Sequence, residues 1–361
     1  MRPVDEMELS KFLRLRDGPV HVLGGGTRRL GVVDGDAVDS SAMAGVRIYE
    51  PGALTLVAGA GTPLDDVVAV LAAERQRLAF EVPDMRGLLG RNGASTMGGV
   101  VASGAAGPRR VQVGSCRDHV LGLRYVSGAG VVVKTGGRVM KNVTGLDLAK
   151  LMVGSHGALG VITEVAFRVQ AVPEAEVTLV GTRGLAEGLA ALRRALGSPF
   201  DVTGAAYEGG AALIRVEGMA GSVAYRAAAL RARLGGDWEL IDGAASAARW
   251  VRVRDVAAFA GRDGAVWRVS IRPTDAEAVV EGLDAEAVFD WGGGLIWLLA
   301  AADLPVRERL AGRGHATLVR SAAGMAGVPV FQPEAPGVAA LARGIKAKFD
   351  PKGILGPGVL G

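Results

Sequence analysis

The sequence predicts an α+β protein with two domains, and three observations support this class. At 361 residues the chain is long enough to bury two hydrophobic cores. Clusters of glycine dominate residues 1–172, whereas segments with strand and helix periodicity alternate over 173–320. The stretch Ala171-Val172-Pro173-Glu174 lies where the pattern changes. We therefore expect a first domain over 1–172, a second over 173–320 and a C-terminal segment over 321–361.

The first domain is expected to combine short helices with strands of alternating apolar residues. Thr62 is predicted to cap a helix, and Gly154 to end another as the residue after its C-cap. The buried face of the helix after Thr62 is expected to consist of Leu64, Val67, Val68 and Leu71. The other helices are expected over 7–16 and 146–153, and the strands over 21–23, 46–49, 54–58, 120–126, 131–134 and 161–169.

Strands and helices follow one another in the second domain in a βαββαβ-like order, which suggests a ferredoxin-like layer. Four leucines share one face of its first helix, and they are Leu185, Leu189, Leu192 and Leu196. Later elements are expected to extend the layer, and one last helix follows in the C-terminal segment. The strands are expected over 177–180, 211–216, 238–240, 266–271, near 288 and over 295–299, and the helices over 185–196, 223–234, 245–258, 274–283 and 338–349.

Composition excludes several classes of protein. Hydrophobic residues make up 49% of the chain and charged residues 22%, which is typical of an ordered globular protein. The net charge of +4 comes without a long basic run, and aromatic residues make up only 5%, so nucleic-acid binding is not predicted. The single cysteine, Cys116, cannot form an internal disulfide or hold an iron–sulfur cluster alone. We expect it to be a small buried residue.

No metal site and no membrane span are predicted. The four histidines are far apart and never at the spacing of zinc ligands. Met1 is followed by charged residues rather than by the apolar segment of a secretory signal. The most apolar run, Leu295 to Ala302, is much shorter than the roughly 20 residues of a spanning helix. We expect a cytoplasmic protein that attaches to a membrane, if at all, through a partner.

Small residues gather in the triplet Gly24-Gly25-Gly26 and in the stretch from Arg91 to Gly160. Glycine, alanine and serine let a backbone approach a bulky partner, and turns of this kind direct N–H groups at an anion. A large phosphate-bearing cofactor on main chain is therefore predicted, with Arg28 or Arg29 adding charge. Taken alone, the triplet is as typical of a plain turn. A Walker loop is excluded, because no Gly-Lys-Ser/Thr follows, and Leu64 breaks a dinucleotide motif that begins at Gly59.

Together these motifs resemble the FAD-binding domain of the vanillyl-alcohol oxidase type (PCMH type). The motifs are Gly24-Gly25-Gly26-Thr27, Ser95-Thr96-Met97-Gly98-Gly99, residues 117–122, residues 141–148 and residues 157–164. The tail over 346–358 is similar to the C-terminal end of the same superfamily. Within it, the chain most resembles the FAD-binding (E) subunits of bacterial glycolate oxidases. The features that indicate this are the turn Gly136-Gly137-Arg138, the segment Trp291-Gly292-Gly293 with Trp297, and the short length.

The resemblance implies a PCMH-type domain of two subdomains, a ferredoxin-like α/β cap domain and a C-terminal tail that returns to the FAD domain. It also implies non-covalent FAD, because relatives with covalent flavin use a His or Cys in loops where this chain has Arg28. Two loops would hold the pyrophosphate, and a third segment would approach the adenosine through main chain. The first loop is Gly24, Gly25, Gly26, Thr27 and Arg28; the second is Gly93, Ser95, Thr96, Gly98, Gly99, Ala102 and Ser103; the third segment is Gly160, Val161 and Ile162.

No catalytic residue is predicted. Relatives that oxidise 2-hydroxy acids carry a paired-histidine motif in the cap domain, and such imidazoles are suited to take a proton. Between Pro173 and Ala301 this chain has no histidine, and His315 stands alone. Arg109 and Arg110 are either anchors for a substrate carboxylate or the flavin, or a pair of surface arginines.

The resemblance implies an FAD-dependent oxidoreductase that works as one subunit of a glycolate oxidase or dehydrogenase complex. Such a subunit would support oxidation of glycolate to glyoxylate and pass electrons within the complex. Its partners would be a second flavoprotein subunit and an iron–sulfur subunit. Two alternatives stay open: a free-standing FAD-dependent oxidoreductase of another small 2-hydroxy acid or alcohol, and a scaffold subunit without catalysis.

Overall fold

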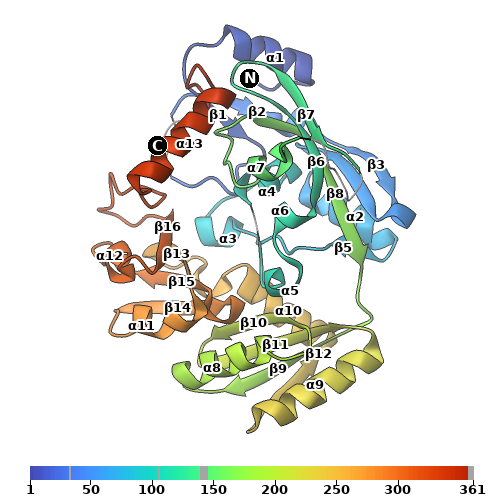
Figure 1. The fold of residues 1–361 in the computed structure, drawn as a ribbon, viewed down its shortest axis with the longest axis vertical. Coiled ribbons are helices and arrows are strands. Elements are labelled where there is room, and N and C mark those ends of the chain that lie inside the picture. Colours follow the sequence, from blue (N-terminus) through green and yellow to red (C-terminus); the bar gives the residue numbers. More distant parts are fainter. Residues whose placement is uncertain (32–33, 105, 139–144, 357–361) are drawn as a thin grey trace.

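The described part of the chain forms three β-sheets with helices packed on them (Figure 1). The computed structural model describes residues 1–31, 34–104, 106–138 and 145–356. Two parts of the predicted motifs, Lys141 to Thr144 and Pro357-Gly358, lie outside these ranges. Among the described helices, none combines the length and the apolar character needed to span a bilayer.

The smallest sheet joins β1 (Val20–Leu23) and β2 (Asp36–Asp39) in parallel. Helix α1 (Glu6–Leu15) packs on it, since Leu9 and Leu13 are fully buried in one cluster with Val20 and Val38. Asp5 caps α1 by accepting a hydrogen bond from the N–H of Glu8 at 2.8 Å. The predicted first helix and first strand are both present, each shifted by one residue.

An antiparallel sheet forms the centre of the first domain, in the order β3-β4-β8-β6-β7, with β5 paired to β8. Its inner face packs on helices in one hydrophobic cluster, and Cys116 is fully buried in this cluster, as predicted. Val165, Phe167 and Val169 of β8 are buried, as their alternation indicated. The strands are β3 (Val46–Glu50), β4 (Thr55–Gly59), β5 (Gln76–Leu78), β6 (Val120–Val126), β7 (Val132–Gly136) and β8 (Val161–Ala171), and the helices are α2 (Leu64–Ala73), α3 (Arg86–Leu89), α4 (Met97–Ser103), α5 (Arg110–Val113), α6 (Cys116–His119) and α7 (Leu148–Met152).

The start of α2 differs from the prediction. Pro63, not Thr62, is the N-cap residue of this helix. The Thr62 hydroxyl donates instead to the carbonyl oxygen of Gly59 at 2.7 Å, and so closes the turn that leaves β4. The predicted buried face was also wrong at Val68, which is 50% exposed, whereas Val67 and Leu71 are fully buried.

The cap domain begins with a βαββαβ unit: β9 (Ala175–Thr182), α8 (Leu185–Leu196), β10 (Val202–Glu208), β11 (Ala211–Gly218), α9 (Ala220–Leu234) and β12 (Glu239–Asp242). Its strand order, β12-β9-β11-β10, is that of a ferredoxin-like layer, which confirms the predicted architecture. Helix α8 has the predicted bounds. Strand β10 was not predicted, because all seven of its residues are buried and no alternation marks it.

A second unit of the same order follows: β13 (Ala265–Ile271), α11 (Ala276–Val280), β14 (Ala285–Asp290), β15 (Leu295–Ala300), α12 (Val306–Leu310) and β16 (Gly314–Arg320). Its strands lie in the order β14-β15-β13-β16, so each unit presents its second strand to the other. The two units join where β10 pairs with β14, and Tyr207 opposes Phe289 there. The predicted extension of the first layer is therefore a repeat of it.

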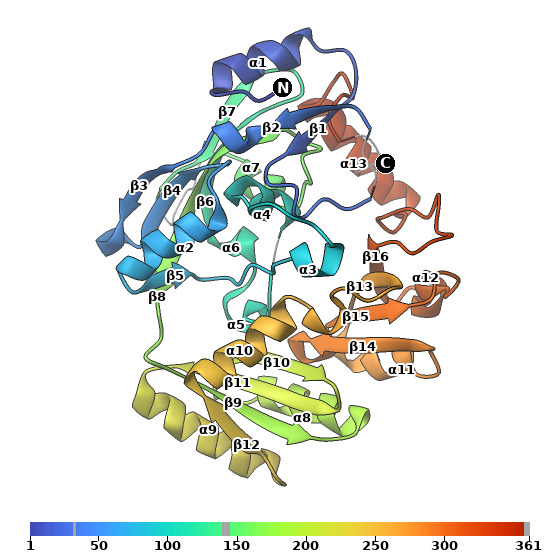
Figure 2. The same ribbon diagram turned by 180° about the vertical axis from the view of Figure 1, so that it is seen from behind.

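The two faces of this eight-stranded sheet are covered differently. Helices α8, α9, α11 and α12 lie on one face (Figure 1) over a single large hydrophobic cluster. Helix α10 (Gly243–Arg254) lies on the opposite face, on the side of the first domain (Figure 2). There Trp250 packs on Ala206 and Leu213, and its indole N–H donates to Thr178 Oγ1 at 2.7 Å. The remainder of this face is turned toward the loops of the first domain.

The C-terminal segment returns to the first domain, as predicted. After α13 (Pro336–Phe349), residues 350–356 run beside β1. The N–H of Val20 donates to the carbonyl oxygen of Ile354 at 2.7 Å, and the N–H of Gly356 donates to that of Val20 at 3.2 Å. The Asp350 carboxylate, 2% exposed, accepts from the N–H groups of Ile354 and Leu355 and from Lys346 Nζ.

Replacing Asp350 by alanine should lower the free energy of unfolding by about 3 kcal/mol, because it leaves two buried N–H groups without an acceptor and removes the counter-charge of Lys346, which keeps only its hydrogen bonds to the carbonyl oxygens of Ala158 and Leu355. Urea unfolding at neutral pH measures this change. Asp17→Ala is the matched control, since that carboxylate is 96% exposed and lies 3.8 Å from Lys352. Equal effects of the two substitutions would contradict the role given to Asp350.

Candidate cofactor site

The two predicted phosphate loops lie directly against each other. A Cβ on Gly24 would be 2.2 Å from Thr96 Oγ1, and one on Gly25 would be 1.5 Å from the carbonyl oxygen of Ala94. A Cβ on Gly93 would likewise be 2.6 Å from the carbonyl oxygen of Gly25. These glycines are therefore required by the contact between the loops, which no larger residue permits.

Arg28 joins the same two loops. Its Nε donates to Ser95 Oγ at 3.1 Å, and its Nη2 donates to the carbonyl oxygen of Pro83 at 2.5 Å. Burial lowers the pKa of Arg28 to about 10, so the guanidinium stays charged at neutral pH. The side chain predicted to contact a pyrophosphate thus also holds the loops together.

A cavity of about 110 Å³ opens beside the loops. Three residues of the two predicted loops, Gly93, Ser95 and Gly98, do not line it. Gly98 packs on Ala60, where a Cβ on the glycine would be 2.8 Å from the Ala60 methyl group. The predicted residues that line the cavity are Gly24, Gly25, Gly26, Thr27, Arg28, Thr96, Gly99, Ala102 and Ser103. The structure therefore brings most of the two loops to one surface.

A larger cavity of about 1030 Å³ adjoins the first one. The two share Arg29, Leu30, His156 and Phe331 in their walls, and the larger is closed by residues 318–334. Two observations fit an elongated anionic cofactor. Arg29 Nε is buried without a hydrogen-bond partner in the described chain, and no atom lies within 4 Å of where a Cβ of Gly26 would be. The main chain at Gly26 is thus open to a ligand.

His156 and Phe331 line both cavities and were not predicted. Their rings pack at a centroid distance of 5.2 Å, and the N–H of His156 donates to the carbonyl oxygen of Ala102 at 2.8 Å. Burial lowers the pKa of His156 to about 4, so its imidazole is neutral at pH 7. The histidine stands within a glycine cluster, which was a usable signal, whereas Phe331 lies in a stretch without any pattern.

The third predicted segment lies at the start of β8. Val161 pairs with Val126 and Ile162 pairs with Tyr125, and the two side chains are buried in different hydrophobic clusters. A Cβ on Gly160 would be 2.7 Å from Tyr125 Cδ2. The side chains of this segment are therefore used within the protein, and none of its three residues lines either cavity, so its approach to the adenosine stays a prediction.

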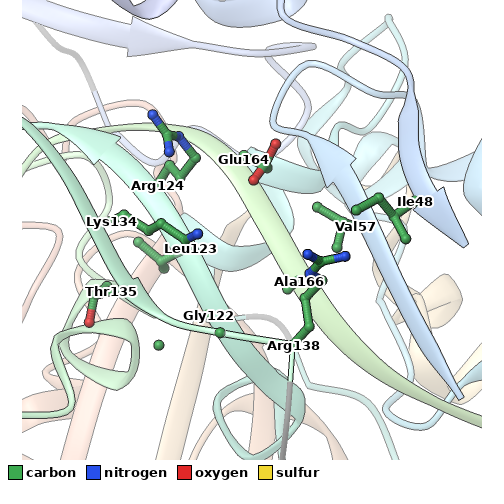
Figure 3. A pocket seen from close by; sticks show the side chains of 12 residues that line it. Ile48, Val57, Gly122, Leu123, Arg124, Lys134, Thr135, Arg138, Glu164 and Ala166 are labelled. Atoms are coloured by element: carbon green, nitrogen blue, oxygen red, sulfur yellow. The ribbon is translucent and has the colours of Figure 1, made fainter. Parts of the chain in front are cut away.

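A separate depression of about 140 Å³ lies on the outer face of the central sheet (Figure 3). Arg124, Lys134 and Arg138 border it together with Glu164. The turn Gly136-Gly137-Arg138 is located here, and a Cβ on Gly136 would be 2.3 Å from the carbonyl oxygen of Leu121. The glycine is thus needed for close pairing of β6 and β7, and none of the predicted cofactor residues lines this depression.

Arg109 is neither a substrate anchor nor a surface residue, contrary to both predictions. It is 6% exposed and forms a bidentate pair with Glu217 of the cap domain at 2.9 and 3.0 Å. Its N–H also donates to Glu81 at 2.6 Å. Arg215 donates to Glu81 at 2.9 Å, and Arg77 donates to Glu217 at 2.7 Å. We call these five side chains the interdomain ion cluster.

The charges of this cluster stabilise one another. Burial raises the pKa of Glu217, but Arg215 and Arg109 outweigh it and hold that pKa well below its usual range. The pKa of Glu81 is lowered in the same way, against burial, by Arg215 and Arg109. Both carboxylates are therefore ionised at neutral pH. Among the described residues, no group of three or more His, Cys, Asp or Glu side chains is placed to hold a metal ion.

Comparison with known proteins indicates an FAD-binding protein. Residues 1–136 match the model of a family described as an FAD binding domain. The glycolate oxidase subunit GlcE of Escherichia coli (strain K12) is 37% identical over 329 residues, which cover 90% of this chain and 87% of that protein. The glycolate oxidase subunit GlcD of Bacillus subtilis (strain 168) is 41% identical, but over only 24% of this chain and 18% of that protein.

Solved structures share the whole fold. An alkyldihydroxyacetonephosphate synthase superposes with a TM-score of 0.69 over 99% of this chain and 76% of that chain. Its sequence identity is 15%, so this likeness concerns the fold alone. The repeated cap and the returning tail are thus part of an architecture found in known proteins.

Replacing Glu217 by glutamine should lower the free energy of unfolding at pH 7 by about 3 kcal/mol, because three arginines lose a buried negative charge. The difference in the free energy of unfolding between the wild type and Glu217→Gln should become smaller as the pH falls. The pKa of Glu217 is depressed on folding, so its contribution is present above the unfolded pKa of about 4.3 and is lost as the pH falls toward the folded value.

Urea unfolding at pH 7 and at about pH 3 measures both effects. Glu286→Gln serves as the control, since its carboxylate is 60% exposed and pairs with Arg262 at the surface. A wild type and a Glu217→Gln variant that differ by the same amount at both pH values would contradict the assignment.

Proposed function

The chain belongs to the family of FAD-binding proteins that includes the glycolate oxidase subunit GlcE, and from this premise we propose that it is the FAD-binding subunit of a complex that oxidises glycolate to glyoxylate. It is an FAD-dependent oxidoreductase subunit. The observation that carries the proposal is the similarity to GlcE over nine-tenths of the chain.

The chain's own residues would hold FAD without a covalent bond. The main chain of Gly24 to Arg28, together with Thr96 and Gly99, would surround the pyrophosphate, and Arg29 would supply a second positive charge. Cys116 is not suited to attach the flavin, because it is fully buried in the core and burial raises the pKa of its thiol. When bound, FAD supplies the acceptor for the two electrons of a 2-hydroxy acid.

The residues around the cavities support a division of labour between subunits. Oxidation of a 2-hydroxy acid needs a group that takes the hydroxyl proton, and such a group works best with a pKa near 7. Among the described residues that line the two cavities, His156 is the one imidazole, and its pKa of about 4 makes it a weak base. A partner flavoprotein subunit would carry out this step.

The same reasoning extends to the electron acceptor. One cysteine cannot ligate an iron–sulfur cluster, so an iron–sulfur subunit would receive the electrons. The assembled protein would thus be a hetero-oligomer that works in the cytoplasm, with any attachment to a membrane made by a partner.

Anaerobic titration with glycolate tests the proposal. The purified chain should be yellow, should take up FAD and should keep its flavin oxidised, whereas the complex purified with its partners should be bleached by glycolate. Rapid and complete bleaching of the isolated chain would contradict the division of labour and favour a free-standing oxidoreductase. Protein that is colourless and takes up no FAD would indicate a scaffold subunit.

Arg29→Gln should weaken FAD binding by about tenfold, because the guanidinium in the wall of both cavities would lose its charge-assisted contact with the cofactor. The FAD content of purified protein and titration of the flavin-free protein with FAD measure this change. Arg262→Gln is the control, since that arginine is 45% exposed on the cap domain and pairs with Glu286. Unchanged FAD affinity in Arg29→Gln would remove this residue from the site.

A further inference from the structure

One indole at the junction of the two domains is flanked by two arginines. The Cζ atom of Arg110 lies 4.8 Å from the centroid of the Trp291 ring, and the Cζ atom of Arg268 lies 5.4 Å from it. Arg110 begins α5 in the first domain, whereas Arg268 is in the middle of β13 in the cap. Two positive charges from different domains therefore meet at one aromatic ring.

Trp291 is held firmly in this position. Its indole N–H donates to the carbonyl oxygen of Gly107 at 3.1 Å, which ties the cap to the loop before α5. Its main-chain N–H donates to Asp290 Oδ1 at 2.7 Å, and its backbone has a φ of +54°. A left-handed conformation is strained for tryptophan, and strain of this kind is retained where the surroundings fix the residue.

Neither arginine has a partner of opposite charge in the part of the chain that the structure describes. Neither side chain makes a hydrogen bond or an ion pair, in contrast to Arg109 nearby. Arg110 is exposed, and Arg268 is half-buried. Burial, and then the charge of Arg110, lowers the pKa of Arg268 to about 10, so both guanidiniums remain charged at pH 7. An unpaired pair of like charges is unfavourable unless an anion joins it.

The neighbouring side chains do not supply that anion. On β16, Thr317 lies opposite Arg268. His315 of the same strand lies opposite Ser270, two residues after Arg268 and therefore on the same face of the sheet. Burial and the charge of Arg268 lower the pKa of His315, which keeps the imidazole neutral at pH 7. Burial raises the pKa of Asp290 to about 8, so its carboxyl group is largely uncharged. Among the described residues, the strand partners of Arg268 are thus uncharged, since Thr317 lies opposite it on β16 and Trp297 opposite it on β15.

We propose that Arg110 and Arg268 bind the carboxylate of a small organic acid between them, against the ring of Trp291. A guanidinium offers two parallel N–H donors that match a carboxylate, and the indole gives the short carbon chain an apolar surface. That the acid is a 2-hydroxy acid or its 2-oxo product rests on the proposed function.

Titration of the purified full chain with glycolate tests the proposal, followed by heat and by tryptophan fluorescence. Binding should saturate with one site per chain. Arg110→Gln and Arg268→Gln should each weaken the affinity for glycolate by about tenfold, because each removes one guanidinium that donates to the carboxylate. Trp291→Phe should abolish most of the fluorescence change. Arg272→Gln is the matched control, since this arginine is 76% exposed and pairs with Asp275, and it should leave the affinity unchanged.

Three results would overturn the proposal: no saturable binding of glycolate, an unchanged affinity in both Arg110→Gln and Arg268→Gln, or equally tight binding of chloride or phosphate. Arg110 is exposed, so its variant should fold even if Arg268→Gln does not, and thermal melting of each variant verifies this. The FAD content of every sample is measured as well. A failure of the proposed function would appear as a chain without flavin, independently of the carboxylate titration.

Discussion

The interdomain ion cluster fixes how the cap meets the FAD-binding domain. Arg77, Glu81 and Arg109 come from the first domain, and Arg215 and Glu217 from β11 of the cap. Buried ion pairs add little net stability compared with apolar packing, but they tolerate only one geometry. The cluster therefore sets the register between the two domains. Residues on the inner face of the cap sheet, including Arg268, are positioned relative to the first domain by this cluster together with the hydrogen bond from Trp291 to Gly107.

The repeat within the cap places the turn that carries Trp291 near the middle of the cap sheet. Because the two βαββαβ units meet at β10 and β14, the turn after β14 lies near the centre of the joined sheet rather than at an outer edge. Trp291 follows directly on β14 and reaches Gly107. The Trp-Gly-Gly segment thus serves as a connection between domains, and its glycines avoid clashes, since a Cβ on Gly292 would be 2.5 Å from Leu196.

Local sequence patterns predicted local structure, but they did not predict contacts between residues that are far apart in the sequence. Helix α8 was predicted to the residue because its leucines recur on one face, and most of the small residues predicted for the two loops line one cavity. Arg109 was misjudged because its partner Glu217 lies 108 positions away in the sequence. Phe331 was missed because only the fold brings it against His156. Long-range contacts of this kind leave no periodicity to detect.

The pairing of β1 with residues 354–356 also determines when the hydrophobic cluster around β1 can be completed during synthesis of the chain. Residues 1–349 leave the ribosome before this partner is available, so the cluster around Leu9, Val20 and Val38 stays open at Ile354 and Leu355 until the end. The loop after β1 is attached to that unfinished cluster. Chains fold domain by domain from the N-terminus, whereas contacts between distant segments form late. The support of this loop is therefore completed only when Ile354 and Leu355 join the cluster.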